Sequence, residues 1–125
     1  MARPKSSMLT EGELRLMNVL WEHGSATVKD VVEALPKGQT LAYTTVMTTL
    51  QTLAQKGFLK HEKQGRAFVY TPLVSRKQTR QSAINYILSR FFNDSPELLV
   101  LNILEHREID DKAQKQLRKL LKESE

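Results

Sequence analysis

Apolar residues recur three and four positions apart from residue 14 onward, a spacing that predicts an amphipathic helix. We expect this helix to cover residues 11–23, because Thr10 and Glu13 stand at the spacing of a capping box. Leu9 and Leu14 are placed for the accompanying hydrophobic staple. The predicted buried stripe consists of Leu14, Met17, Leu20 and Trp21.

The same spacing returns twice more before residue 57. A second helix is expected to start after Thr27 and to end at Pro36, which cannot continue a helix. A third helix is expected over about residues 42–56, closed by Gly57. The predicted buried positions of these two helices are Val31, Val32, Leu35, Val46, Leu50 and Leu53.

After the third helix the apolar period changes from 3.6 to 2, which predicts strands at 59–63 and 67–71. Gly65, in the turn KQGR, can adopt the positive φ of a tight hairpin, and Pro72 cannot donate to a further ladder bond. The aromatic residues predicted to form the core of this small sheet are Phe58, Phe68 and Tyr70. Three helices followed by a hairpin indicate a winged helix-turn-helix head over residues 8–72.

Residues 75–124 are predicted to form a separate α-helical dimerisation tail, so the fold class is mainly α with a small β-hairpin. Ser95 and Asp110 are placed to cap its second and third helices. Three helices of about forty-five residues in all cannot readily bury so many apolar side chains alone, so we expect a homodimer; the alternative is that the tail folds back onto its own head. The predicted dimerisation residues are Ile84, Ile87, Leu88, Phe91, Leu98, Leu101, Ile103, Leu104, Leu117, Leu120 and Leu121.

Positive charge gathers in the middle of the chain, which has a net charge of +5 overall. Residues 37–80 contain eight Lys and Arg residues and one acidic residue, Glu62. Such a region attracts a polyanion, although a solvated basic surface is the alternative. There is no apolar run long enough to span a membrane and no cysteine, and the polar, basic residues 1–8 do not look like a signal peptide, so we expect a cytoplasmic protein without membrane insertion.

The third predicted helix contains five threonines within residues 42–53, although threonine costs a helix roughly half a kcal/mol relative to alanine. A threonine hydroxyl and methyl can contact base edges in the major groove of DNA, and basic residues at a hairpin tip can hold phosphate. The predicted DNA-binding residues are Tyr43, Thr44, Thr45, Thr48, Thr52, Lys63 and Arg66. The alternatives are that threonine hydroxyls bond back to the helix, that Tyr43 is a core or staple residue, and that the hairpin tip is merely solvated.

The sequence offers no support for catalysis. The three histidines, His23, His61 and His106, fall on separate predicted elements without metal-ligand spacing, and neither a Gly-rich phosphate loop nor a serine elbow is present. We therefore expect no enzyme activity, no cofactor and no metal.

Four segments together resemble the penicillinase repressor family of bacteria, BlaI/MecI: LTEGELRLMNVLWEHGSATVKDVVEAL, LAYTTVMTTLQTLAQKGFL, EKQGRAFVYTP and LLVLNILE. The resemblance covers residues 8–124. It implies a homodimeric repressor that binds inverted-repeat operators, often with TACA/TGTA-like half-sites, and that controls its own operon and resistance or stress genes.

The resemblance also implies induction by a membrane-bound sensor protease system that cleaves the tail after an asparagine. The matching position is Asn102, followed by Ile103 where antibiotic-responsive members have Phe. Many relatives carry Arg where this chain has Thr52. Two other functions remain open: an architectural or RNA-contacting winged-helix protein, and a protein-interaction module whose threonine face meets another protein.

Overall fold

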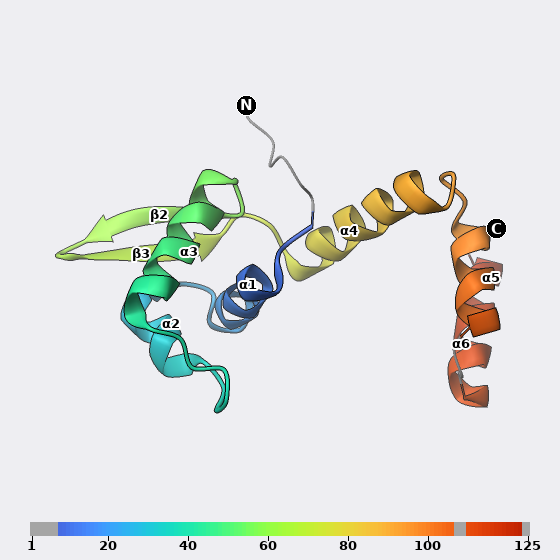
Figure 1. Ribbon diagram of the computed structural model, residues 1–125, viewed down its shortest axis with the longest axis horizontal. Helices are drawn as coiled ribbons and strands as arrows, with labels where there is room; N and C mark the ends of the chain where they lie inside the picture. Colours follow the sequence, from blue (N-terminus) through green and yellow to red (C-terminus); the bar gives the residue numbers. More distant parts are fainter. Residues whose placement is uncertain (1–7, 107–109, 124–125) are drawn as a thin grey trace. The chain divides into compact units, whose positions relative to one another are not determined.

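The computed structural model describes residues 8–106 and 110–123, with side chains up to residue 119 (Figure 1). The side chains of Leu120 and Leu121, two predicted dimerisation residues, lie outside this set. The chain folds into two compact units, one up to Tyr86 and one from Ile87 onward. The division falls within helix α4 (Arg76–Phe91), further along the chain than the boundary predicted after residue 72.

The first unit begins with the three predicted helices, α1 (Glu11–His23), α2 (Val28–Ala34) and α3 (Tyr43–Gln55). The capping box of α1 is confirmed: the Thr10 hydroxyl accepts from the Glu13 amide at 3.1 Å, and the Glu13 carboxylate accepts from the Thr10 amide at 2.9 Å. Thr27 caps α2 in the same way, together with Asp30.

A three-stranded antiparallel sheet completes the first unit, in the order β1-β3-β2. The predicted hairpin is confirmed as β2 (Leu59–Gln64) and β3 (Ala67–Pro72), and Gly65 in its turn has a φ of +62°. The short strand β1 (Ala26–Thr27), which the sequence did not predict, pairs with Tyr70 and Val69 of β3. The fold is therefore a winged helix in which the segment leading into α2 is joined to the hairpin.

One hydrophobic core lies among α1, α2, α3 and the sheet. Its largest fully buried side chains are Leu16, Met17, Leu20, Leu50, Leu53, Leu59, Val31 and Val46. Two predictions of burial were wrong. Leu14 is 41% exposed, because the buried side of α1 runs through Leu16 and Val19. Phe68 is 46% exposed, because it lies opposite Lys63 near the free end of the hairpin, away from the core. Trp21 is half-buried at the edge of the core, and its indole N–H donates to the Val74 carbonyl at 2.9 Å.

The described residues of the second unit lie mainly in helices: the end of α4, then α5 (Pro96–His106) and α6 (Asp111–Glu123). The predicted caps are confirmed: Ser95 accepts from the Leu98 amide at 3.1 Å, and Asp110 accepts from the Ala113 amide at 2.8 Å. Neither α4 nor α5 contains a buried residue. Among the residues described, no helix is long and apolar enough to cross a bilayer.

Candidate nucleic-acid interface

Helix α3 has one fully buried face and one exposed face. Val46, Leu50 and Leu53 are completely buried against the core. At 100° per residue, the opposite face is centred on a row spaced four, three and four positions apart. The members of this row are Thr44, Thr48, Gln51 and Gln55, and all four are exposed. The row therefore presents two short hydroxyl side chains followed by two longer amides.

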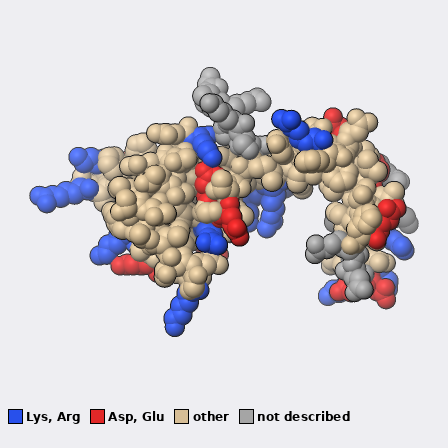
Figure 2. All heavy atoms as spheres, in the orientation of Figure 1, with Lys and Arg blue, Asp and Glu red and all other residues tan. Residues whose placement is uncertain are grey.

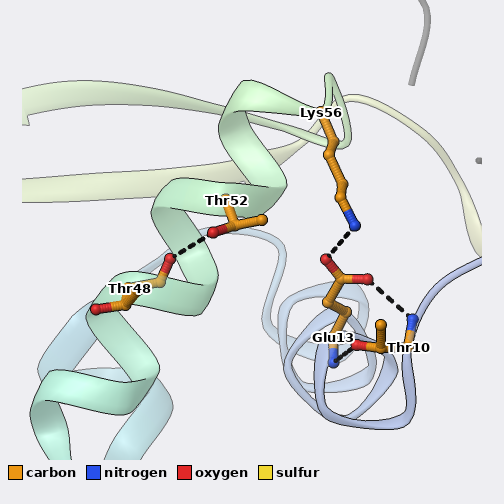
Figure 3. Close-up of polar contacts among 5 residues, drawn as sticks. All are labelled: Thr10, Glu13, Thr48, Thr52 and Lys56. Carbon is orange, nitrogen blue, oxygen red and sulfur yellow. Dashed lines mark hydrogen bonds and ion pairs between the residues drawn. The ribbon is translucent and has the colours of Figure 1, made fainter. Parts of the chain in front are cut away.

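The five threonines of α3 divide by what their hydroxyls do. Thr49 donates to the Thr45 carbonyl at 2.8 Å, and Thr52 donates to the Thr48 carbonyl at 3.0 Å (Figure 3). Both are half-buried. Within the described ranges, the hydroxyls of Thr44, Thr45 and Thr48 make no hydrogen bond, and these side chains are exposed. The alternative that a threonine hydroxyl bonds back to the carbonyl four residues earlier is therefore confirmed for Thr49 and Thr52.

Tyr43, at the first position of α3, is 55% exposed, so the core half of the alternative core-or-staple role is wrong. Of the seven predicted DNA-binding residues, Tyr43 and the four threonines thus lie on one helix, while Lys63 and Arg66 lie on the hairpin. Sequence reasoning did not single out Gln51 and Gln55. The signal was available, since both continue the row of Thr44 and Thr48, but the contacts expected on this helix were restricted to its threonines and Tyr43.

The end of α3 is fixed to the start of α1 by a buried carboxylate. Glu13 is 4% exposed, and its Oε2 lies 2.7 Å from the Nζ of Lys56, the C-cap residue that follows α3. Its other oxygen, Oε1, is the one that closes the capping box with Thr10 (Figure 3). One side chain therefore satisfies the first turn of α1 and holds the last turn of α3.

The ionisation of Glu13 reflects these contacts. Burial raises the pKa of its carboxyl group, but the hydrogen bond and charge of Lys56 and the hydrogen bonds of Thr10 together lower it further than burial raises it. The net pKa lies below the ordinary value of 4.5, so Glu13 is ionised at neutral pH. The charges of Glu13 and Lys56 neutralise each other, and the ion pair holds the Lys56 side chain away from the exposed row of α3.

Two of the basic residues at the end of α3 and in the hairpin are paired with carboxylates, which leaves fewer positive charges available to an anionic ligand. Lys56 is paired with Glu13, and Lys60 lies 3.7 Å from Glu62. In the part of the chain that the structure describes, Lys63 and Arg66 have no ion pair, and both are exposed. Lys and Arg atoms project where the hairpin ends (Figure 2). The described residues contain no group of three His, Asp or Glu side chains that could hold a metal.

The predicted tail residues are only partly covered. Leu98, Leu101, Ile103 and Leu104 of α5 are exposed, as are Ile84 and Phe91 of α4, and Phe91 is 74% exposed. Ile87, Leu88 and Leu117 are half-buried. Asn102, at the candidate cleavage position, is half-buried within α5, and its side-chain amide donates to the Leu98 carbonyl at 2.9 Å.

Comparison with known proteins agrees with this architecture. The sequence profile of the penicillinase repressor family matches residues 9–123. The penicillinase repressor of Bacillus licheniformis is 34% identical, over 95% of this chain and 93% of its own. The methicillin resistance regulatory protein MecI of Staphylococcus aureus is 22% identical, over 94% of this chain and 95% of its own. The solution structure of the DNA-binding domain of the repressor BlaI is 38% identical and superposes with a TM-score of 0.52, covering 59% of this chain and 90% of that domain. The chain therefore belongs to the penicillinase repressor family, a family of transcriptional repressors.

Proposed function

We propose that the protein is a homodimeric repressor that recognises inverted-repeat operator DNA by placing α3 in the major groove. The observation that carries this proposal is the exposed row of Thr44, Thr48, Gln51 and Gln55, directly opposite the buried face of α3. Glutamine amides can pair with adenine through two hydrogen bonds, and threonine offers a hydroxyl and a methyl to base edges. The likeness to the DNA-binding domain of the repressor BlaI supports a DNA-binding role for this head.

The remaining predicted contacts of the head would be made with the DNA backbone. Lys63 and Arg66, without an ion pair in the described residues, extend the interface from α3 to the hairpin and are placed to bind phosphate. Tyr43 and Thr45, both exposed, flank the row and can reach sugar or phosphate. Thr52 donates its hydrogen to the helix but keeps oxygen lone pairs that can accept a bond.

Dimerisation would cover the apolar side chains of the tail. The exposed residues of α5 include Leu98, Leu101, Ile103 and Leu104, and a single chain leaves them in contact with water. Large exposed apolar patches on soluble proteins usually mark interaction surfaces. Two symmetric copies would bring two heads onto two half-sites of an inverted repeat, and occupying both raises affinity far beyond that of one head.

Release from DNA would follow from loss of this dimer. In line with the family resemblance, we propose that a membrane sensor protease system cleaves the Asn102–Ile103 bond in response to an inducing signal. The cut divides α5 and separates Ile103 and Leu104 from the rest of the dimer surface. Each head would then bind a single half-site and dissociate at working concentrations, which relieves repression of the operon, including the repressor gene itself.

Fluorescence anisotropy tests the proposal with three duplexes: the DNA upstream of the protein's own gene, the same duplex with one half-site scrambled, and a fully scrambled duplex. We expect binding to the intact duplex to be tighter by a hundredfold or more, with most of this advantage lost when one half-site is scrambled. Equal affinity for all three duplexes would refute sequence-specific repression and favour the architectural alternative. Absence of binding to any duplex would favour a protein-interaction role.

A further inference from the structure

A hollow of about 310 Å³ separates α1 from the first turns of α4, within the first unit. Leu14, Asn18 and Trp21 of α1 are spaced four and three positions apart, so they share one face of that helix. The face of α4 that meets them carries Arg76, Thr79, Arg80 and Ala83. Met8 and Leu9, just before α1, complete the lining. None of these residues belongs to α3 or the hairpin, so the hollow is distinct from the proposed DNA interface.

The wall of the hollow is largely apolar. Leu14, which sequence patterning assigned to the core, is instead exposed here, and the indole of Trp21 forms a second flat surface. Trp21 is held in place by its hydrogen bond to the Val74 carbonyl. The hollow is at the small end of the 300–1,000 Å³ range typical of ligand sites, so it suits a small molecule.

Two guanidinium groups supply the only formal charges among the lining residues. The Arg76 guanidinium lies 5.3 Å from the centre of the Trp21 ring and 3.5 Å from the Asn18 amide oxygen, so it is positioned without a carboxylate partner. Arg80 is exposed and has no ion pair among the described residues. Arginine pairs well with planar or tetrahedral anions because its fork offers two parallel donors.

A second hollow continues from Arg76 and Arg80 around the other side of α1. Glu11 and Glu22 line that side, together with Arg15, which lies 4.0 Å from Glu11. These two carboxylates offset the arginines on that side, so an anion meets a weaker net positive field there than on the Trp21 side, where no acidic residue lines the wall. The arrangement combines an apolar surface with an unbalanced positive charge.

We infer that the hollow between α1 and α4 binds a small amphipathic anion, meaning an aromatic or aliphatic body with one carboxylate, phosphate or sulfonate. The apolar body lies on Leu14 and Trp21, and the anionic group pairs with Arg80 and the outer edge of Arg76. This site would be additional to the DNA interface, and its occupant would touch the head and the start of α4 together.

The chain provides a built-in probe for this site, because Trp21 is its single tryptophan and gives one indole N–H signal in a ¹H–¹⁵N spectrum. We would titrate the full-length ¹⁵N-labelled protein with 1-naphthoate and, separately, with uncharged 1-naphthalenemethanol. The inference predicts saturable movement of the Trp21 signal with naphthoate at an affinity at least fivefold higher than with the alcohol. No movement of this signal with naphthoate, or equal affinities for the two probes, would overturn it.

Two variants test the charge and the space independently. Arg80→Gln should weaken the binding of naphthoate about fivefold to tenfold, which is the effect of losing one charged hydrogen bond at a partly exposed site. It should leave the affinity for the alcohol unchanged. Lys77→Gln removes the same charge from α4 at a position outside the hollow, so it should leave the affinity for both probes unchanged. Ala83→Leu should weaken the binding of both probes, because the larger side chain fills part of the hollow. An Arg80→Gln variant that binds naphthoate as tightly as Lys77→Gln would contradict recognition of the anion.

Discussion

Replacing Glu13 by Gln tests whether a single carboxylate holds the end of α3 in place. The amide keeps one acceptor oxygen, so it can still accept from the Thr10 amide, but it loses the charge and the second acceptor oxygen that meet Lys56. Removing one member of a fully buried ion pair typically costs about 3–5 kcal/mol. The Lys56 side chain is 33% exposed and can regain water, so we expect a smaller loss, about 2 kcal/mol, as for a hydrogen bond to a charged group.

The first unit falls in the size range of roughly 60–100 residues, for which a loss of about 2 kcal/mol corresponds to a decrease in Tm of about 8–16 °C. Urea and thermal unfolding of the full-length protein at pH 7 would measure it. Glu11→Gln is the matched control, because Glu11 lies in the same first turn, is exposed, and pairs with Arg15 only at 4.0 Å. It should cost at most about 0.5 kcal/mol. A loss in Glu13→Gln no larger than in Glu11→Gln would refute the reasoning.

The pH dependence of the same variant gives a second test. Because the pKa of Glu13 is lower in the folded than in the unfolded protein, its charge contributes stability that is fully present above the unfolded pKa, near 4.5, and that is lost as pH falls through the folded pKa. The difference between the wild type and Glu13→Gln should therefore be constant from pH 6 to 8 and shrink below pH 4.5. A difference that does not change with pH would mean that packing, not charge, accounts for the loss.

Three further predictions concern DNA and assembly. Thr48→Ala should weaken binding to the operator by about 1–3 kcal/mol and binding to random duplex by less. Thr49→Ala should change neither affinity, because the Thr49 hydroxyl donates to the Thr45 carbonyl. Equal effects of the two substitutions on operator affinity, measured by anisotropy, would contradict the assigned face. Arg66→Gln should reduce the slope of log affinity against log salt by about 0.9 for each head on DNA, and an unchanged slope would remove Arg66 from the phosphate contacts. Leu101→Asp should give monomers in sedimentation, because an unpaired charge in an apolar interface is costly, and a variant that remains dimeric would contradict the tail assignment.

Periodicity and turn residues were sufficient to predict the three head helices, the hairpin and the capped helices of the tail. They failed where structure depends on distant neighbours. The strand β1 has two residues, too few to show a period, and forms because β3 offers it a partner. Phe68 fits the alternation of a strand, but its exposure follows from its distance from the core.

The candidate interface was predictable to a similar extent. The buried and exposed faces of α3 follow from its sequence, and its threonines were candidates because of their number and their position opposite the apolar face. The ion pair between Glu13 and Lys56 was not predicted, because these residues are far apart along the chain. Each residue also had a local explanation: Glu13 as part of the capping box, and Lys56 as part of the basic region. Which threonine hydroxyls are already bonded likewise depends on side-chain rotamers that a sequence pattern does not specify.

The short strand β1 has a consequence for the rate and entropy of binding. Thr27 pairs with Val69 of the hairpin and at the same time caps α2, so the hairpin and the helix pair share one residue at their junction. A hairpin attached only through its own chain would sample many orientations and would lose that freedom on meeting DNA. Joined through β1, and also packed on the core through Leu59 and Tyr70, the hairpin is preorganised relative to α2 and its partner α3, so less conformational entropy is lost on association. Disrupting this two-residue strand should therefore slow productive docking even where every contact residue is intact.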